Sequence, residues 1–145
     1  MSADDLRIRA EKLDHEIVNL SEDLRQAEKT YEHERARIET DIAAAQSKID
    51  SLTPYAQDSI EHTGEIHDWQ RRIDVYRQQW ERESMRISSD IEQLRRELET
   101  KKSQSTQTWA ECESAKATEA RQRAAELAAR AQDPNTGTTS DQLAA

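Results

Sequence analysis

The sequence predicts an all-α protein, a long antiparallel coiled-coil hairpin of two helices. Apolar residues recur with alternating gaps of four and three along two long stretches of the chain, which is the spacing of a coiled-coil seam. A break that contains Pro54 and Gly64 separates the two stretches, and the seam changes phase across it. Most positions off the seam are charged or polar, so each helix offers one narrow strip that must pack against another helix.

The first helix is expected over residues 3–52. Ser2 followed by Asp5 is typical of a capping box, in which the serine oxygen accepts an early backbone hydrogen bond. A four-residue step from Ile38 to Ile42 is a stutter, which locally unwinds a supercoil. The apolar seam of this helix consists of Leu6, Ala10, Leu13, Ile17, Leu20, Leu24, Ala27, Tyr31, Ile38, Ile42, Ala45, Ile49 and Leu52.

Residues 53–65 are expected to form a turn region, because the apolar rhythm fails there. Thr53 and Pro54 resemble an N-cap followed by proline at the first helical position. A short helix from Pro54 to Glu61 is therefore one arrangement of this region. The reversal can be placed at Pro54 or near Gly64, so the pairing register of the two helices stays open.

The second helix is expected over residues 66–131. From residue 100 to 108 the seam positions are polar, which predicts the least stable stretch of this helix. Residues 115–131 are rich in alanine and arginine and strongly helix-forming, and a disordered tail is expected over residues 132–145. The apolar seam consists of Ile66, Trp69, Ile73, Tyr76, Trp80, Ile87, Ile91, Leu94 and Leu98.

The same pattern also permits a parallel dimeric coiled coil, in which the chain ignores the break and pairs with an identical chain. The phase change, the two turn-forming residues and the aromatic seam facing an aliphatic one favour the hairpin. A two-helix hairpin buries little area, so we expect length, dimerisation or docking into a larger assembly to stabilise it.

Composition excludes several classes of protein. Only two glycines and two prolines occur among 145 residues, which is too few turn formers for a compact domain with a single core. The net charge is −9 and no segment is a basic block, so a nucleic-acid partner is not expected. No apolar stretch approaches the ~20 residues of a membrane span, so we expect no membrane insertion and a cytoplasmic location.

No catalytic, cofactor or metal site is expected. His62 and His67 stand five residues apart, which places them on different faces of a helix rather than on the shared face of a metal site. Cys112 is the only cysteine, which excludes an intrachain disulfide and a cysteine-based metal site. Its acidic neighbours, Glu111 and Glu113, argue against a nucleophile.

Five residues are candidates for contacts with a protein partner. For Trp69 and Trp80 the main interpretation is packing in the seam, where aromatic residues at helical spacing usually lie. Trp109 is the better candidate for an outward anchor, because its seam neighbours are polar. The alanine- and arginine-rich stretch favours docking of a protein over binding of lipid. The candidates are Trp109, Trp69, Trp80, Arg121 and Arg123.

The layout of residues 3–131 resembles the FliJ/YscO-type stalk proteins of flagellar and type III export machines. The resemblance rests on a first helix, a turn near one-third of the length, and a longer second helix that carries Trp69, Trp80 and Trp109. It implies a small antiparallel hairpin with a role in protein transport that contacts an export ATPase and an export gate. It includes no residue motif, so no site is carried over.

The expected function is that of a non-enzymatic interaction or scaffold protein. Its helix ends and surfaces would bind protein partners, either a second copy of the chain or a larger assembly. A stalk-like component of an export apparatus is the narrower alternative, and a ligand- or metal-binding helical protein is the alternative of another class.

Overall fold

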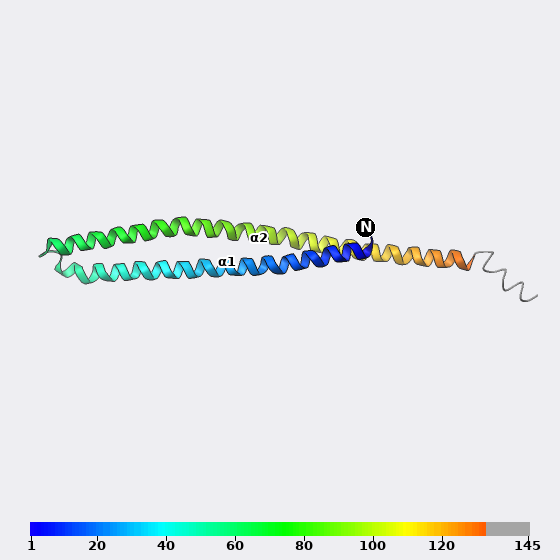
Figure 1. The fold of residues 1–145 in the computed structure, drawn as a ribbon, viewed down its shortest axis with the longest axis horizontal. Coiled ribbons are helices and arrows are strands. Elements are labelled where there is room, and N and C mark those ends of the chain that lie inside the picture. Colours follow the sequence, from blue (N-terminus) through cyan, green and yellow to red (C-terminus); the bar gives the residue numbers. More distant parts are fainter. Residues whose placement is uncertain (133–145) are drawn as a thin grey trace, which may run out of the picture. The chain divides into compact units, whose positions relative to one another are not determined.

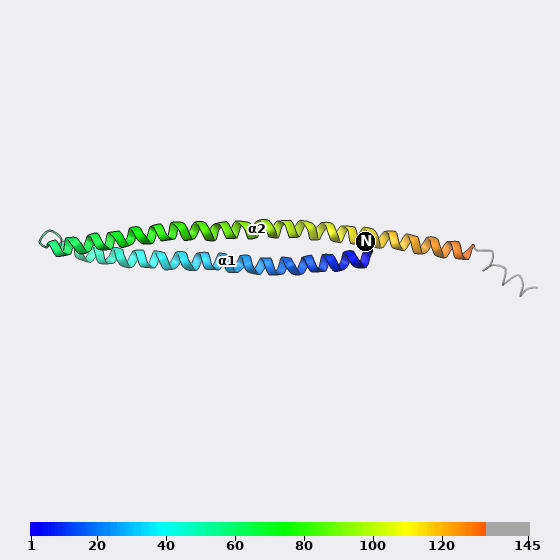
Figure 2. The ribbon, with the colours of Figure 1, turned by 45° about the horizontal axis from the view of Figure 1, so that its top comes forward.

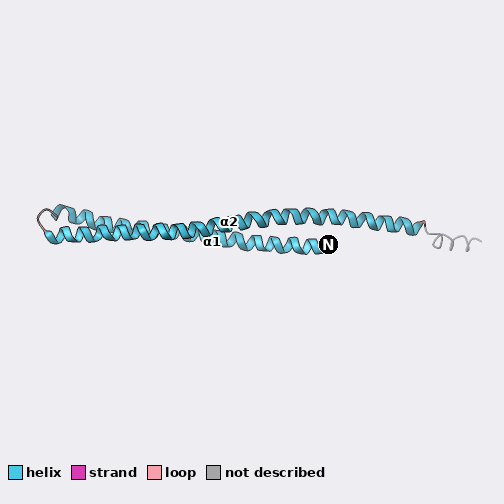
Figure 3. Cartoon of the chain, turned by 90° about the horizontal axis from the view of Figure 1, so that it is seen from above, coloured by secondary structure: helices cyan, strands magenta, loops and turns pink. Residues whose placement is uncertain are grey.

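The structure, a computed structural model, describes residues 1–132 and contains two long helices joined by a short turn (Figure 1). Helix α1 spans Ala3–Leu52, the 3-10 helix η1 spans Thr53–Tyr55, and helix α2 spans Ile60–Ala131. No strand occurs among residues 1–132 (Figure 3), and the all-α prediction is confirmed. The predicted disordered tail lies outside the described residues, apart from Gln132.

Helices α1 and α2 pack against each other (Figure 2), which confirms the helical hairpin rather than a helix that pairs only with another chain. The packing divides into two units. Unit 1 comprises Met1–Val18 and Glu99–Ala145, and unit 2 comprises Asn19–Leu98. Within each unit, contacts pair rising residue numbers of α1 with falling numbers of α2, so the helices run antiparallel.

The start of α1 has the predicted capping box. The Asp5 amide donates to Ser2 Oγ at 3.2 Å, and the Ser2 amide donates to Asp5 Oδ2 at 3.4 Å. Outside the seam, i,i+3 and i,i+4 ion pairs line the exposed face, such as Arg25 with Glu22 at 2.7 Å. Solvent screens exposed pairs of this kind, so they support the helix without deciding the fold.

The predicted cap at Thr53 is wrong. Its hydroxyl donates to the Ile49 carbonyl at 2.7 Å, so it finishes α1 instead of starting a new helix, and η1 is only three residues long. The side chain that caps α2 is Ser59, whose Oγ accepts from the His62 amide at 3.3 Å. A hydroxyl cap can start a helix at a residue where no apolar seam has begun. The apolar pattern of the sequence therefore did not reveal this start.

Helix α2 therefore begins at Ile60 rather than at residue 66, and the short helix predicted from Pro54 to Glu61 does not form. The chain reverses between η1 and Ser59, so the reversal is not at Gly64. Gly64 lies inside α2, and a Cβ on it would meet nothing within 4 Å.

Unit 2 packs around large side chains. Its buried cluster joins Ala45 and Ile49 of α1 to Ile73 of α2. Further along, the rings of Tyr31 and Trp80 meet with centroids 5.3 Å apart at a tilt of 50°, which is a favourable aromatic geometry.

Unit 1 packs around small side chains. Ala10 and Cys112 are both fully buried, and the Cys112 thiol donates to the Ala3 carbonyl at 3.4 Å. Small residues at a helix contact let the two backbones approach closely. The buried residues of this unit are Ala3, Leu6, Ala10, Leu13, Ser105, Thr108 and Cys112.

Replacing Ile73 by alanine tests the seam, because the change removes apolar atoms from the buried cluster of unit 2 and leaves a cavity. We expect the free energy of unfolding to fall by about 2–3 kcal/mol. Urea denaturation followed by circular dichroism measures it. Val75→Ala is the matched control, since Val75 is 49% exposed whereas Ile73 is 4% exposed. Equal losses for both variants would contradict the register described for unit 2.

Candidate partner-binding surfaces

The predicted anchor Trp109 has a partner inside unit 1. Its indole Nε1 donates to Asp14 Oδ2 at 2.9 Å, and the Ser105 hydroxyl donates to the other oxygen of the same carboxylate. These two bonds, the one from Ser105 first, lower the pKa of Asp14 below its ordinary value of 3.8. Asp14, Ser105 and Trp109 therefore form a polar network that joins α1 to α2 within this unit.

The polar stretch from residue 100 to 108 is held by such bonds and not by apolar packing. Ser105 and Thr108 are each only 6% exposed, and the Thr108 hydroxyl donates to the Gln104 carbonyl at 2.7 Å. Lys101 Nζ lies 2.9 Å from Glu16 Oε2. The stretch continues α2 as an unbroken helix. Polar neighbours therefore do not turn Trp109 outward, and a partner-binding role for its half-buried ring stays a prediction.

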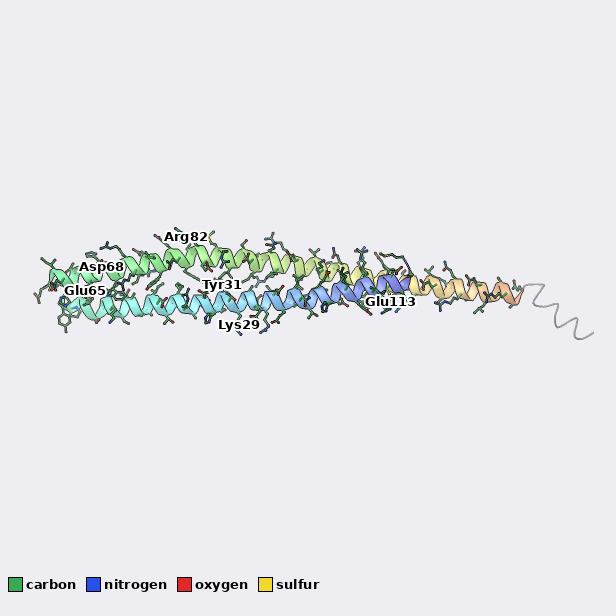
Figure 4. The ribbon with its side chains drawn as sticks, in the orientation of Figure 1. Lys29, Tyr31, Glu65, Asp68, Arg82 and Glu113 are labelled. Carbon is green, nitrogen blue, oxygen red and sulfur yellow. The ribbon has the colours of Figure 1, made fainter. Side chains whose placement is uncertain are left out.

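Trp69 and Trp80 lie in the seam of unit 2, half-buried. Arg72 covers Trp69, with its guanidinium carbon 4.2 Å from the ring centroid, which is a cation–π contact. Trp80 packs against the ring of Tyr31, which lies on α1 (Figure 4). Both indoles are thus engaged within the chain, so neither is an obvious anchor for a partner.

Arg121 and Arg123 lie on the last turns of α2, where nothing from α1 covers the helix. The last contact is at Glu119, whose carboxylate accepts from the Ala3 amide at 3.0 Å. All described residues after Glu119 are exposed, and Leu127 is 64% exposed. Within unit 1, α2 continues past the start of α1 (Figure 1), so these turns present a free helical surface.

The structure also reveals an exposed apolar surface at the turn, which sequence reasoning missed. Ile60 is 93% exposed and Tyr55 is 60% exposed. Ile60 lines an open hollow of about 250 Å³ at the start of α2. The hollow is lined by Ala56, Gln57, Asp58, Ser59, Ile60 and Thr63.

The turn is also the most one-sidedly charged part of unit 2. Residues 49–70 contain five acidic residues and no lysine or arginine. Glu65 and Asp68 lie on α2 near the turn (Figure 4). Within the described residues, Asp58, Glu61 and Glu65 form no ion pair, in contrast to the paired carboxylates along the helices. A partial signal was present in the sequence, since the absence of basic residues over 49–70 can be read directly.

Unit 2 has two open grooves, one lined in part by Tyr31 and the other by Trp80. One, of about 420 Å³, runs beside Tyr31 and Ile91 with Glu28, Glu92 and Arg95 at its rim. Arg95 Nη2 lies 3.4 Å from Glu28 Oε1 across the two helices. The other, of about 440 Å³, is lined by Glu34, Arg37, Ile38, Gln79, Trp80, Arg82 and Glu83. In the second groove Arg37 pairs with Glu34 at 2.8 Å, and Glu83 pairs with Arg86, which lowers the pKa of Glu83.

Nothing in residues 1–132 forms a group of three or more metal-binding side chains. His62, one of the two histidines considered for a metal, stacks against Tyr55 with centroids 5.9 Å apart. None of the described helices is long and apolar enough to cross a membrane.

The chain matches no protein-family profile, no curated protein and no solved structure. The functional proposal below therefore rests on the geometry of the described residues.

Asp14→Ala tests the polar network of unit 1. The change leaves the Trp109 indole and the Ser105 hydroxyl without their acceptor, so we expect the free energy of unfolding at pH 7 to fall by about 1 kcal/mol. Chemical denaturation measures it, with Asp23→Ala as the control, because Asp23 is an exposed aspartate of the same helix. A loss no greater than that of the control would contradict the network.

The lowered pKa of Asp14 also predicts how the stability difference between the original chain and Asp14→Ala depends on pH. A carboxylate with a depressed pKa in the folded state stabilises the fold above its unfolded-state pKa, and loses that effect as the pH falls through the folded value. The stability advantage of the original chain over Asp14→Ala should be full at neutral pH and should shrink below about pH 3.8. An advantage that grows on acidification would contradict the assignment.

Proposed function

We propose that this chain is a non-enzymatic interaction protein, in which the paired helices hold protein-binding surfaces at the turn and on the last turns of α2. The observation that carries the proposal is the exposure of large apolar side chains at these two places. Ile60 and Tyr55 are both exposed at the turn, and Leu127 is exposed where α1 no longer covers α2.

Single exposed apolar residues are normal on protein surfaces, so the grouping carries the argument. At the turn, Ile60 lines a hollow and Tyr55 is exposed nearby in the sequence. The same short stretch of chain carries the carboxylates of Asp58, Glu61 and Glu65. Apolar anchors with a charged rim are typical of sites where proteins bind each other. Near Leu127 in the sequence, Arg121 and Arg123 supply the opposite charge.

The remaining features of the chain support a scaffold rather than an enzyme. The titratable groups with shifted pKa values take part in helix-surface pairs or in the polar network of Asp14. Cys112 is fully buried and donates to a backbone carbonyl, which removes it from any reaction with a substrate. We place the protein in the cytoplasm, where an unpaired thiol stays reduced.

Photo-crosslinking in the native cell tests this proposal. A crosslinking amino acid at position 60 or 127 should capture protein partners, because both side chains point to solvent. The same amino acid at position 85 is the matched control, since Met85 is 69% exposed but stands apart from both surfaces. Partners captured equally at position 85, or at none of the three positions, would overturn the proposal.

A narrower candidate is a stalk-like component of a type III or flagellar export apparatus. The observation that favours it is the antiparallel hairpin with a second helix that continues past the start of the first, because the stalk proteins that the sequence resembles share that outline. Under this candidate the protein captured at position 60 or 127 would be an export ATPase or gate component. Capture of unrelated proteins only would leave the general proposal standing and remove this one.

A further inference from the structure

We propose that copies of this chain associate with one another, with the turn of one copy binding the last turns of α2 of the next. The two surfaces are named by their residues. The tip surface comprises Tyr55, Ile60 and the carboxylates of Asp58, Glu61 and Glu65. The tail surface comprises Ala124 and Leu127 with Arg121 and Arg123. The inference rests on the proposed function, since it names the partner of those protein-binding surfaces.

The tip surface offers a place for one aliphatic side chain. The hollow of about 250 Å³ has Ala56 and Ile60 as apolar walls and Asp58 at its rim. A leucine side chain needs less room than this. The adjoining face of α2 is open, because a Cβ at Gly64 would touch nothing within 4 Å. A helix can therefore approach the hollow closely.

The tail surface presents Leu127, an exposed aliphatic side chain of the kind that the hollow at the tip could take. Leu127 is 64% exposed, and Ala124 and Ala131 lie three and four residues from it, on the same helical face. Arg123 lies four residues before Leu127, one turn away on the same face. The side chain that would enter the hollow is thus framed by small residues and by a cation.

Helix α1 of the same chain does not cover the face of α2 that carries Leu127. The seam of α2 in unit 1 runs through Cys112, Ala115 and Glu119, and its continuation in steps of three and four reaches Gln122 and Glu126. Leu127 lies about 100° further round the helix than Glu126. The apolar face of the last turns is therefore not an extension of the α1–α2 seam, and it needs a different occupant.

Charge selects a second copy as that occupant. The region around the tip, residues 49–70, carries five acidic and no basic residues, whereas residues 120–131 carry three arginines and one glutamate. The tip surface itself carries three carboxylates, of Asp58, Glu61 and Glu65, and the tail surface carries the two cations of Arg121 and Arg123. Like surfaces of two copies would repel each other, so tip-to-tip and tail-to-tail contacts are disfavoured and tip-to-tail contact is favoured.

The contact is heterologous, so a bound pair of copies leaves one tip and one tail unoccupied, and further copies can add to it. Only a few side chains meet, which makes each contact weak. Because the charges lie at the surface, salt should weaken the association further.

Analytical ultracentrifugation of the purified full chain tests the proposal. The weight-average mass should rise above the 16.7 kDa of one chain with increasing concentration, and should fall back as salt is raised. Ile60→Gln or Leu127→Gln should each weaken the association about tenfold or more, through loss of one buried aliphatic side chain. Met85→Gln, another exposed apolar position, should leave it unchanged.

Mixing the two variants separates this geometry from any other dimer. A chain with Ile60→Gln keeps its tail, and a chain with Leu127→Gln keeps its tip, so the mixture retains one intact contact. It should form one-to-one complexes of about twice 16.7 kDa and nothing longer. Circular dichroism checks that both variants stay helical, as expected for exposed positions.

Arg123→Glu, which reverses a tail charge without touching Leu127, is a second variant that should also weaken the association.

Three results would overturn the proposal: a monomer at all concentrations, a dimer unaffected by either glutamine variant, or a mixture that assembles no better than each variant alone. These failures are distinct from failure of the proposed function. A purified chain that stays monomeric but captures a different protein at positions 60 and 127 in cells would remove self-association and keep the interaction protein.

Discussion

Packing between one narrow strip of side chains on each helix is the interaction on which both units depend. The covered positions of α1 keep gaps of three and four from Ala3 to Leu52, and most positions between them are charged. An isolated helix of this kind has no apolar surface to bury except along that strip, so each helix is stable only against its partner. The exposed ion pairs support helix formation, but they cannot replace the seam.

The seam changes its chemistry between the two units. In unit 2, aliphatic and aromatic residues such as Ile73 and Trp80 supply the buried area. In unit 1 the positions facing α1 include Ser105 and Thr108, and a shared carboxylate at Asp14 satisfies donors from α2. Apolar packing tolerates small shifts along a helix, whereas a carboxylate that must meet two donors specifies one alignment. Unit 1 thus contributes register where unit 2 contributes buried area.

Periodicity and capping rules were enough to predict the all-α hairpin and the capping box of Ser2 and Asp5. They failed where a structure is decided by single hydrogen bonds. The start of α2 depends on the Ser59 hydroxyl, and the burial of Ser105 depends on an aspartate 91 residues away in the sequence. No local pattern contains such information, because the donor and the acceptor become neighbours only after the chain has reversed.

The surfaces proposed for partners could be predicted only in part, because some of them depend on where the chain reverses. Arg121 and Arg123 could be selected from sequence, since alanine- and arginine-rich turns after the seam have little else to pack against. Ile60 could not, because an isoleucine is expected to be buried until the position of the turn is known. Its exposure follows from its place as the first residue of α2. Trp109 shows the opposite case, an apparent anchor that the fold uses internally.

The distance between spin labels at positions 28 and 95 tests the antiparallel pairing most directly. Both residues belong to unit 2, where Arg95 Nη2 lies 3.4 Å from Glu28 Oε1. The labels would be attached in a Cys112→Ala background and diluted with unlabelled protein, so that only pairs within one chain are measured. The hairpin predicts a short distance, set by about 10 Å between helix axes and the label tethers. A continuous helix would separate the same positions by about 100 Å, and that result would contradict the pairing.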